Sequence, residues 1–342
     1  MKSNLDKLLS AVFLALWIMG TAACANAASQ ASPVPLPPAE QALPTETAEK
    51  WITVTPNNDV LEGAIFDAAG NLLFCDVSKR QVLRLTPDKE LSVLLELPDL
   101  AAGGLAFHQD GRLFMAALDL EKGKGAVLAW SSSTGKIETI IPVESGYWPN
   151  DLVFAPDGGF YFSNFKRSAA TPPGGVYHVS PDFKTVTPVM PNLDQANGVA
   201  LSPDGKMLWA TEFAKNRLHR AVLTDPVTIS PVGAAVPYHF TGITPDSMRV
   251  DKNGNVYVAL YGQGRIMIFN ERGLPIGQIL LPERETGKNL VSTSLAINPA
   301  ENELFVVSSN DEASRPAAIF RAGALSSGMP PLHEKKQADT HE

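Results

Sequence analysis

Four side chains that can supply oxygen ligands recur at one offset along the 342-residue chain. Each position lies eight residues before the glycine, or its asparagine equivalent, of a repeated turn, and the six positions are Glu62, Gly103, Asn150, Asn197, Asp246 and Ser294. Two carboxylates and two amides are donors that hard divalent cations prefer, and a cation between them would offset the cost of burying charge. The set contains no thiol or imidazole, which argues against a structural zinc site. We therefore predict a calcium ion held by Glu62, Asn150, Asn197 and Asp246, with magnesium, manganese or zinc as alternatives.

Neighbours of these ligands could carry the reaction chemistry. Asp151 follows Asn150, and a carboxylate beside a bound metal ion can act as general base on water or orient a ligand. Two plainer interpretations stay open: Asp151 as the cap of a turn, and the whole ring as a structural network of hydrogen bonds with channel water. The predicted catalytic residues are Asp151 and Asp246, and the predicted substrate contacts are Ser247, Trp148 and Ser294.

A repeated sequence motif indicates which secondary-structure elements must position these residues. Asp or Asn with Gly, followed by aromatic and aliphatic residues, occurs around Gly70, Gly111, Gly158, Gly205 and Gly254, with a degenerate copy at Asn302. Such turns supply the positive φ angles that tight hairpins need. Successive copies are 41 to 49 residues apart, which is the size of four short strands and their turns. The sequence therefore predicts an all-β, six-bladed β-propeller, and it lacks the amphipathic helices that two α/β domains would require.

The repeats also set the expected domain boundaries. We predict the propeller over residues 50–323, closed by pairing of residues 51–55 with residues 317–321, which removes a free sheet edge. Residues 28–49 are rich in Pro and Ala and are predicted to form a flexible linker. The polar residues 324–342 are predicted to be a frayed tail.

The first 27 residues have the composition of an export signal, because two lysines precede an apolar run over residues 8–23 that is followed by small residues. Cleavage after Ala27 would release an extracytoplasmic protein, periplasmic or secreted. The segment ending at Cys24 instead resembles a lipobox, which would give a lipid anchor. Both routes stay open, whereas a retained membrane anchor is disfavoured because the run is shorter than the roughly 20 residues that span a bilayer.

The net charge and the cysteine content limit the binding partners and the thiol chemistry that the protein can have. The formal net charge of −8 disfavours nucleic acid as a partner. If Cys24 is removed or lipidated, Cys75 remains as a single cysteine, and its place in an apolar run favours a small buried residue over a reactive thiol. The sequence leaves the oligomeric state open.

Four phrases resemble the senescence marker protein, gluconolactonase and luciferin-regenerating-enzyme family, here called the SGL family. They begin at Leu61, Pro149, Ala196 and Pro245, reading LEGA, PND, ANGVALSPDG and PDSM. The likeness covers roughly residues 50 to 322, and within the family it is strongest to bacterial drug-responsive, calcium-dependent lactonases. It implies a six-bladed propeller, a catalytic calcium ion and hydrolysis of a lactone ester. The resemblance also places Asp151 and Ser247 in or beside the active centre, next to the four ligands named above.

The resulting hypothesis is metal-dependent hydrolysis of a small-molecule lactone to a hydroxy acid. One alternative is a phosphotriester hydrolase that uses the same metal ion. Another is an extracytoplasmic binding propeller in which the ion is purely structural.

Overall fold

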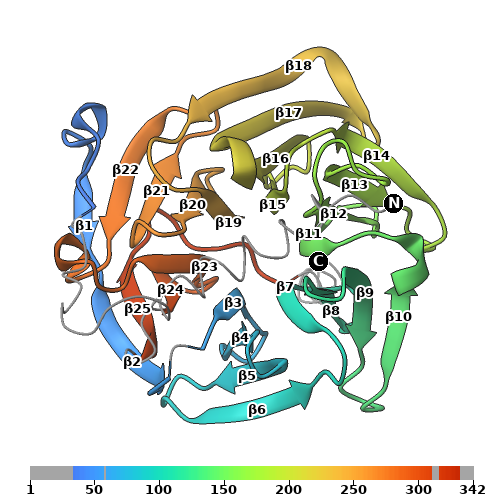
Figure 1. Ribbon diagram of the computed structural model, residues 1–342, viewed down its shortest axis with the longest axis horizontal. Helices are drawn as coiled ribbons and strands as arrows, with labels where there is room; N and C mark the ends of the chain where they lie inside the picture. The colour runs from blue at the N-terminus through green and yellow to red at the C-terminus, as the bar shows by residue number, and fades with distance from the viewer. Residues whose placement is uncertain (1–33, 58, 310–315, 332–342) are drawn as a thin grey trace, which may run out of the picture.

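The computed structural model describes residues 34–57, 59–309 and 316–331, and this part of the chain is built almost entirely from β-strands. Six sheets surround a central axis, each with four antiparallel strands, and one sheet carries an additional fifth strand (Figure 1). Single turns of 3-10 helix occur at Pro38–Glu40, Val143–Ser145, Phe213–Lys215 and Arg284–Thr286. The six-bladed β-propeller predicted from the repeat is confirmed.

Each blade runs outward from an inner strand beside the axis. The first contains β3 (Leu61–Phe66), β4 (Leu72–Asp76), β5 (Gln81–Leu85) and β6 (Leu91–Glu96), and the second contains β7 (Ala101–Phe107), β8 (Leu113–Asp119), β9 (Lys124–Trp130) and β10 (Ile137–Ile141). The third contains β11 (Pro149–Phe154), β12 (Phe160–Asn164), β13 (Gly175–Val179) and β14 (Val186–Pro191), and the fourth contains β15 (Ala196–Leu201), β16 (Met207–Glu212), β17 (Arg217–Asp225) and β18 (Thr228–His239). The fifth contains β19 (Pro245–Val250), β20 (Val256–Leu260), β21 (Arg265–Phe269), β22 (Pro275–Leu280) and β1 (Thr45–Thr47), and the sixth contains β23 (Val291–Ile297), β24 (Glu303–Ser309), β25 (Ala317–Gly323) and β2 (Glu49–Thr55).

The repeated turn joins the first and second strands of each blade. Its glycine has φ between 70° and 93° in the first five blades, a backbone conformation that side chains with a Cβ rarely adopt. The glycine N–H closes the turn, as in the 3.1 Å bond from Gly70 N–H to the Asp67 carbonyl oxygen. Because the same turn recurs in the same place, all six inner strands begin at one end of the channel and finish at the other.

The ring is closed by strands from both ends of the propeller. β2 pairs antiparallel with β25, with Lys50 opposite Phe320 and Thr55 opposite Ala317. The predicted pairing of residues 51–55 with residues 317–321 is therefore confirmed. The outer strand of the sixth blade, β2, therefore precedes the first blade in the sequence.

The described part of the predicted linker is ordered, which corrects the expectation of a flexible tether. β1 extends the fifth blade by parallel pairing with β22, and Glu40 is buried with its carboxylate against Arg265 and the Tyr238 hydroxyl. Edge pairing uses backbone groups, so it needs no periodic pattern of apolar residues. Residues 1–33, including the predicted export signal and Cys24, lie outside the described residues. Within the described ranges there is no helix with the length and apolarity to cross a membrane.

The predicted frayed tail is also ordered as far as residue 331. The Leu325 N–H donates to the Tyr257 hydroxyl at 2.8 Å, the Lys252 N–H to the Ser327 carbonyl at 2.9 Å, and the Gly328 N–H to the Asn298 carbonyl at 2.8 Å. These bonds lay residues 324–331 across the turn ends of the fifth and sixth blades. Residues 332–342 lie outside the described part of the chain.

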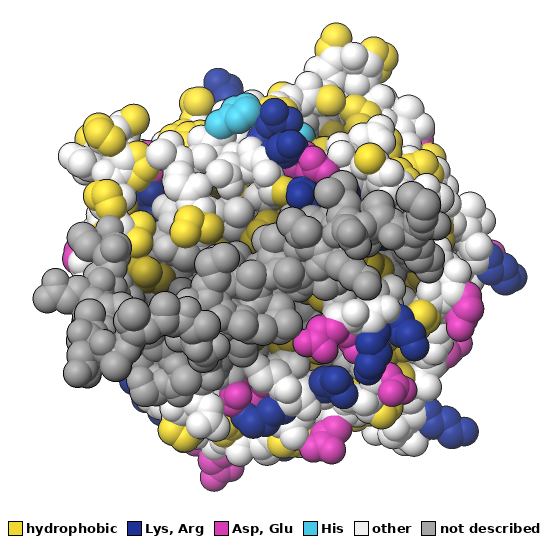
Figure 2. All heavy atoms as spheres, viewed as in Figure 1, with side chains coloured by type: hydrophobic (Ala, Val, Ile, Leu, Met, Phe, Trp, Pro, Cys, Tyr) yellow, Lys and Arg dark blue, Asp and Glu magenta, His cyan; other side chains and the backbone are white. Residues whose placement is uncertain are grey.

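The apolar core is divided among the interfaces between blades. One cluster, for example, joins Tyr257 and Ile266 of the fifth blade to Leu295 and Phe320 of the sixth. Cys75 is fully buried between the first two blades, as expected for a packing residue. On the face drawn in Figure 2, acidic and basic side chains are interspersed around the rim.

Candidate metal centre and active site

All six positions of the predicted ring lie on inner strands, toward one end of the channel. Each inner strand shifts its register against the second strand of its blade at or beside the ring position. Such bulges re-aim side chains locally, and here they occur at equivalent places around the axis. The six residues and their strands are Glu62 on β3, Gly103 on β7, Asn150 on β11, Asn197 on β15, Asp246 on β19 and Ser294 on β23.

Three of the four predicted ligands interact in the structure. The side chain of Asn197 hydrogen-bonds the Asp246 carboxylate, and Asp246 lies close enough to Glu62 to raise its pKa. Asn197 and Asp246 are 3% exposed, and each keeps one buried Oδ1 atom without a hydrogen-bond partner among the described residues. Asn150 is half-buried at the equivalent position of β11. That these four residues hold a metal ion stays a prediction.

The buried carboxyl groups at this end of the channel raise one another's pKa. Burial raises the pKa of Asp246 to about 8, against the lowering effect of the Asn197 hydrogen bond and with a further rise caused by Asp151. Burial, followed by Asp246 and Asp151, raises the pKa of Glu62 well above its ordinary value. A divalent cation would remove this repulsion and occupy the unpartnered oxygens, so the donor set fits a hard ion. No three Asp, Glu, His or Cys side chains in the described ranges form a metal-holding group, so such an ion would also need the amide oxygens.

Asp151 is fully buried beside this set and is held by defined partners. Its Oδ1 atom accepts from the Leu152 N–H at 2.9 Å, and its Oδ2 atom accepts from Arg249 Nη1 at 3.2 Å. Burial raises the pKa of Asp151, and the Arg249 charge opposes that rise. A Cβ atom at Gly104 would lie 2.6 Å from Asp151 Oδ1, so this glycine lets the carboxylate approach the backbone of β7.

Sequence reasoning missed Arg249. Its guanidinium also donates to the carbonyl oxygens of Met248 at 2.7 Å and Ala64 at 3.1 Å, which fixes it across the channel between β19 and β3. If Glu62, Asp151 and Asp246 are ionised, Arg249 leaves a net charge of −2, which one divalent cation would balance. An arginine three residues after Asp246, in a short inner strand, was the signal that could have identified it.

Hydroxyl groups on second strands support the inner strands. The Asp151 N–H donates to Ser163 Oγ at 3.0 Å, and the Gly198 N–H donates to Thr211 Oγ1 at 2.7 Å. The Thr211 hydroxyl in turn donates to the Asp246 carbonyl oxygen at 2.8 Å. These bonds satisfy backbone groups that the bulges remove from the strand ladder, and they hold neighbouring ring positions at a fixed separation.

The predicted substrate contacts have different surroundings. Ser247 is 2% exposed on β19. The fully buried Ser294 hydroxyl accepts from the Ala64 N–H at 3.2 Å and so links the sixth blade to the first. Trp148 donates its indole N–H to the Gly123 carbonyl at 3.0 Å, and Lys166 Nζ lies 5.5 Å from its ring centroid. Contact of these three residues with a substrate stays a prediction.

The raised carboxyl pKa values predict that the calcium-free protein loses thermal stability as the pH rises from about 4 to about 8. The folded protein holds a proton that the unfolded chain has already released, because the Asp246 pKa of about 8 lies above the ordinary value of 3.8. This stabilisation is complete below about pH 4 and is lost as the pH approaches the folded-state pKa. We expect a shallower decline in Asp246→Asn, measured by calorimetry with a chelator.

The difference in melting temperature between the wild type and Asp246→Asn, followed across the pH range, isolates the contribution of Asp246. Burial lowers the pKa of His178 and of His219, so these groups give an opposite slope, but they are common to both proteins. Parallel melting-temperature curves for the wild type and Asp246→Asn would contradict the assignment.

The fold is a six-bladed propeller with a cluster of buried oxygen donors at one mouth of its channel. The chain belongs to the SMP-30/Gluconolactonase/LRE-like family, whose characteristic region matches residues 60–310. The family resemblance found in the sequence is therefore confirmed.

Individual relatives extend this comparison. The chain is 42% identical to Lactonase drp35 of Staphylococcus saprophyticus, over 87% of this chain and 93% of that protein. Identity to Lactonase drp35 of Staphylococcus aureus strain MRSA252 is also 42%, over 84% of this chain and 90% of that protein.

Solved structures agree on the fold. A calcium-binding protein, regucalcin, from Agrobacterium tumefaciens has a TM-score of 0.69 at 22% identity, over 85% of this chain and 99% of that chain. A gluconolactonase from Xanthomonas campestris has a TM-score of 0.65 at 20% identity, over 87% of this chain and 99% of that chain.

Proposed function

We propose that this protein is a calcium-dependent lactonase that opens a lactone ring to a hydroxy acid. The observation that carries the proposal is the pair of buried, unpartnered oxygens on Asn197 and Asp246, next to Glu62, in a chain 42% identical to Lactonase drp35. Glu62, Asn150, Asn197 and Asp246 would hold the ion. The oxygen-only donor set favours calcium over zinc, with magnesium and manganese as further alternatives.

When bound, the ion would supply Lewis-acid polarisation of the lactone carbonyl. Asp151 is the proposed general base, because its pairing with Arg249 favours the ionised form that can accept a proton from water. Water adds to the carbonyl carbon, the ring C–O bond breaks, and the proton taken by Asp151 passes to the departing ring oxygen. Asp246 is the alternative base, provided that it gives up its own proton first. Ser247, Trp148 and Ser294 are the proposed substrate contacts.

We expect Asp151→Asn to reduce kcat for lactone hydrolysis by about 10²- to 10⁴-fold, because it removes the base. Its calcium affinity should change far less, since Asp151 is not a proposed ligand. Hydrolysis of sugar and aromatic lactones would be measured by pH-stat, and calcium binding by isothermal titration calorimetry. Asp182→Asn, which changes an exposed aspartate, is the matched control.

Assays with and without a chelator, on lactone and phosphotriester substrates, distinguish a lactonase from a phosphotriesterase and from a binding propeller. Loss of lactone hydrolysis on chelation and recovery with calcium support the proposal, whereas hydrolysis indifferent to chelation and to Asp151→Asn contradicts it. Turnover of a phosphotriester but no lactone would indicate a phosphotriesterase. Calcium-dependent stability without any turnover would indicate a binding propeller.

A further inference from the structure

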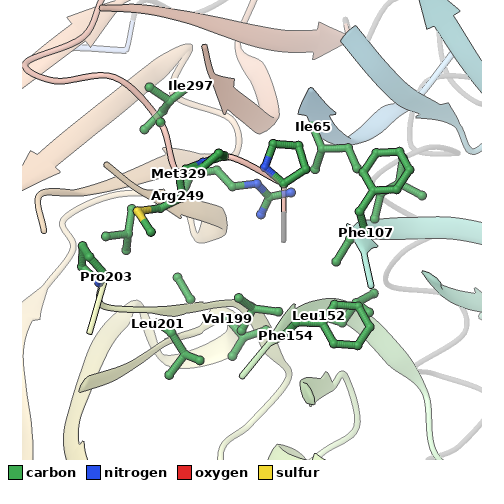
Figure 3. Close-up of a pocket in the computed structure, with 18 of the residues that line it drawn as sticks. Ile65, Phe107, Leu152, Phe154, Val199, Leu201, Pro203, Arg249, Ile297 and Met329 are labelled. Carbon is green, nitrogen blue, oxygen red and sulfur yellow. The ribbon is translucent and has the colours of Figure 1, made fainter. Parts of the chain in front are cut away.

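A cavity of about 430 Å³ opens at the end of the channel opposite the ring residues. It is lined by the later parts of inner strands, such as Leu152 to Phe154 on β11, and by the turns that follow them. Residues 328–331 of the C-terminal segment form part of its rim. Figure 3 shows Ile65, Phe107, Leu201 and Ile297 around the opening, with Met329 at one side. A cavity of this size could accept a small organic molecule.

Among the described residues that line this cavity, Arg249 is the only charged one. Figure 3 shows its guanidinium directed between the apolar walls. Its three hydrogen bonds, to Asp151, Met248 and Ala64, use three of the five N–H groups of a guanidinium. The side chain is 18% exposed, so it is accessible from the cavity. The cavity thus combines apolar walls with a single cationic group at its inner end.

We propose that this cavity binds a small carboxylate with an apolar chain or ring. The carboxylate would accept hydrogen bonds from Arg249, and the apolar part would pack against Phe107, Phe154 and Leu201. The N–H groups of Arg249 that lie outside its three hydrogen bonds favour this ligand, because a neutral apolar molecule would leave them without a partner in the cavity. This binding does not depend on the proposed lactonase activity.

The two ends of the channel are connected through one ion pair. Arg249 Nη1 lies 3.2 Å from Asp151 Oδ2, so a carboxylate in the cavity would compete with Asp151 for the same guanidinium. We therefore expect the ligand to change calcium affinity at the other mouth, and calcium to change ligand affinity by the same factor. Hydroxy acids formed from lactones with long apolar side chains belong to the class of ligand that the cavity would accept.

Decanoate provides a direct test. ¹³C-carboxyl-labelled decanoate, kept below its micelle concentration, would be titrated by NMR and calorimetry into full-length protein treated with a chelator. We expect one saturable site, weakened at least about tenfold in Arg249→Gln, because the charge-assisted hydrogen bonds are lost. Binding of 1-decanol should be little changed by the same substitution. Equal decanoate affinity in the wild type and Arg249→Gln, or no saturable binding to the wild type, overturns the proposal.

A second pair of variants avoids the channel centre in case Arg249→Gln fails to fold. Met329→Glu adds a carboxylate at the rim and should weaken decanoate binding several-fold by repulsion, whereas the neutral Met329→Gln should not. Equal affinity in these two variants contradicts the proposed orientation and site. Because no lactone is present and calcium is chelated, failure here is distinguishable from failure of the proposed lactonase function.

Discussion

Asp246→Asn is expected to lower calcium affinity by at least about 100-fold and to abolish most lactone hydrolysis, because a carboxylate ligand becomes a neutral amide. The substitution keeps the shape of the side chain, so the bulge of β19 and the contact with Asn197 can persist. Glu62→Gln should act in the same direction. Calcium affinity would be measured by calorimetry and hydrolysis by pH-stat.

The same substitution has an opposite effect on the calcium-free protein. Asp246 is buried near Glu62 and Asp151, and burial raises its pKa to about 8, so its ionised form is unfavourable when no cation is present. Asp246→Asn should therefore melt at a higher temperature than the wild type at pH 8 in chelator. Asp204→Asn, which lies in an exposed turn, should alter neither property. Unchanged calcium affinity in both Asp246→Asn and Glu62→Gln would rule out the proposed ligand set.

Glu40→Ala is expected to destabilise the fold by about 3–5 kcal/mol, because it removes the charged partner of a buried arginine. Arg265 is fully buried, and its Nη1 atom pairs with the Glu40 carboxylate, which also accepts from the Tyr238 hydroxyl. Two other guanidinium nitrogens of Arg265 already have no hydrogen-bond partner in the described structure. Loss of Glu40 would leave the charge uncompensated beneath β1, and the melting temperature should fall by about 10 °C.

Glu49→Ala is the matched control, since it breaks an exposed pair with Arg321 and should cost less than about 1 kcal/mol. Replacing Glu40 and Arg265 together by Leu and Met should recover much of the lost stability. Equal, small effects of Glu40→Ala and Glu49→Ala would mean that residues 34–48 contribute little to holding the fifth blade.

The propeller could be predicted from the sequence because the same turn motif repeats along the chain. Asp-Gly and Asn-Gly turns need positive φ, and their period near 45 residues leaves room for four strands, so local chemistry and global architecture agree. The ring positions followed from the same period, because equivalent residues of a rotational repeat share a height. Their location on inner strands could therefore be predicted, although their metal-binding roles stay predictions.

The features that could not be predicted depend on contacts between residues far apart in the sequence. Glu40 and Arg265 are separated by 225 residues, and nothing in the Pro-rich segment around Glu40 marks a partner. β1 joins a sheet edge through backbone groups, which leave little trace in the sequence. Arg249 was missed because only one position in each repeat was compared across the blades, and Arg249 lies three residues further along β19.

The pairing of β2 with β25 has a consequence for biosynthesis. A ribosome makes Glu49 272 residues before Arg321, its partner across the two strands, so β2 must wait unpaired while five blades emerge. A nascent or prematurely terminated chain would expose an open strand edge that invites association with other chains. Only the arrival of the last strands to be synthesised removes that edge.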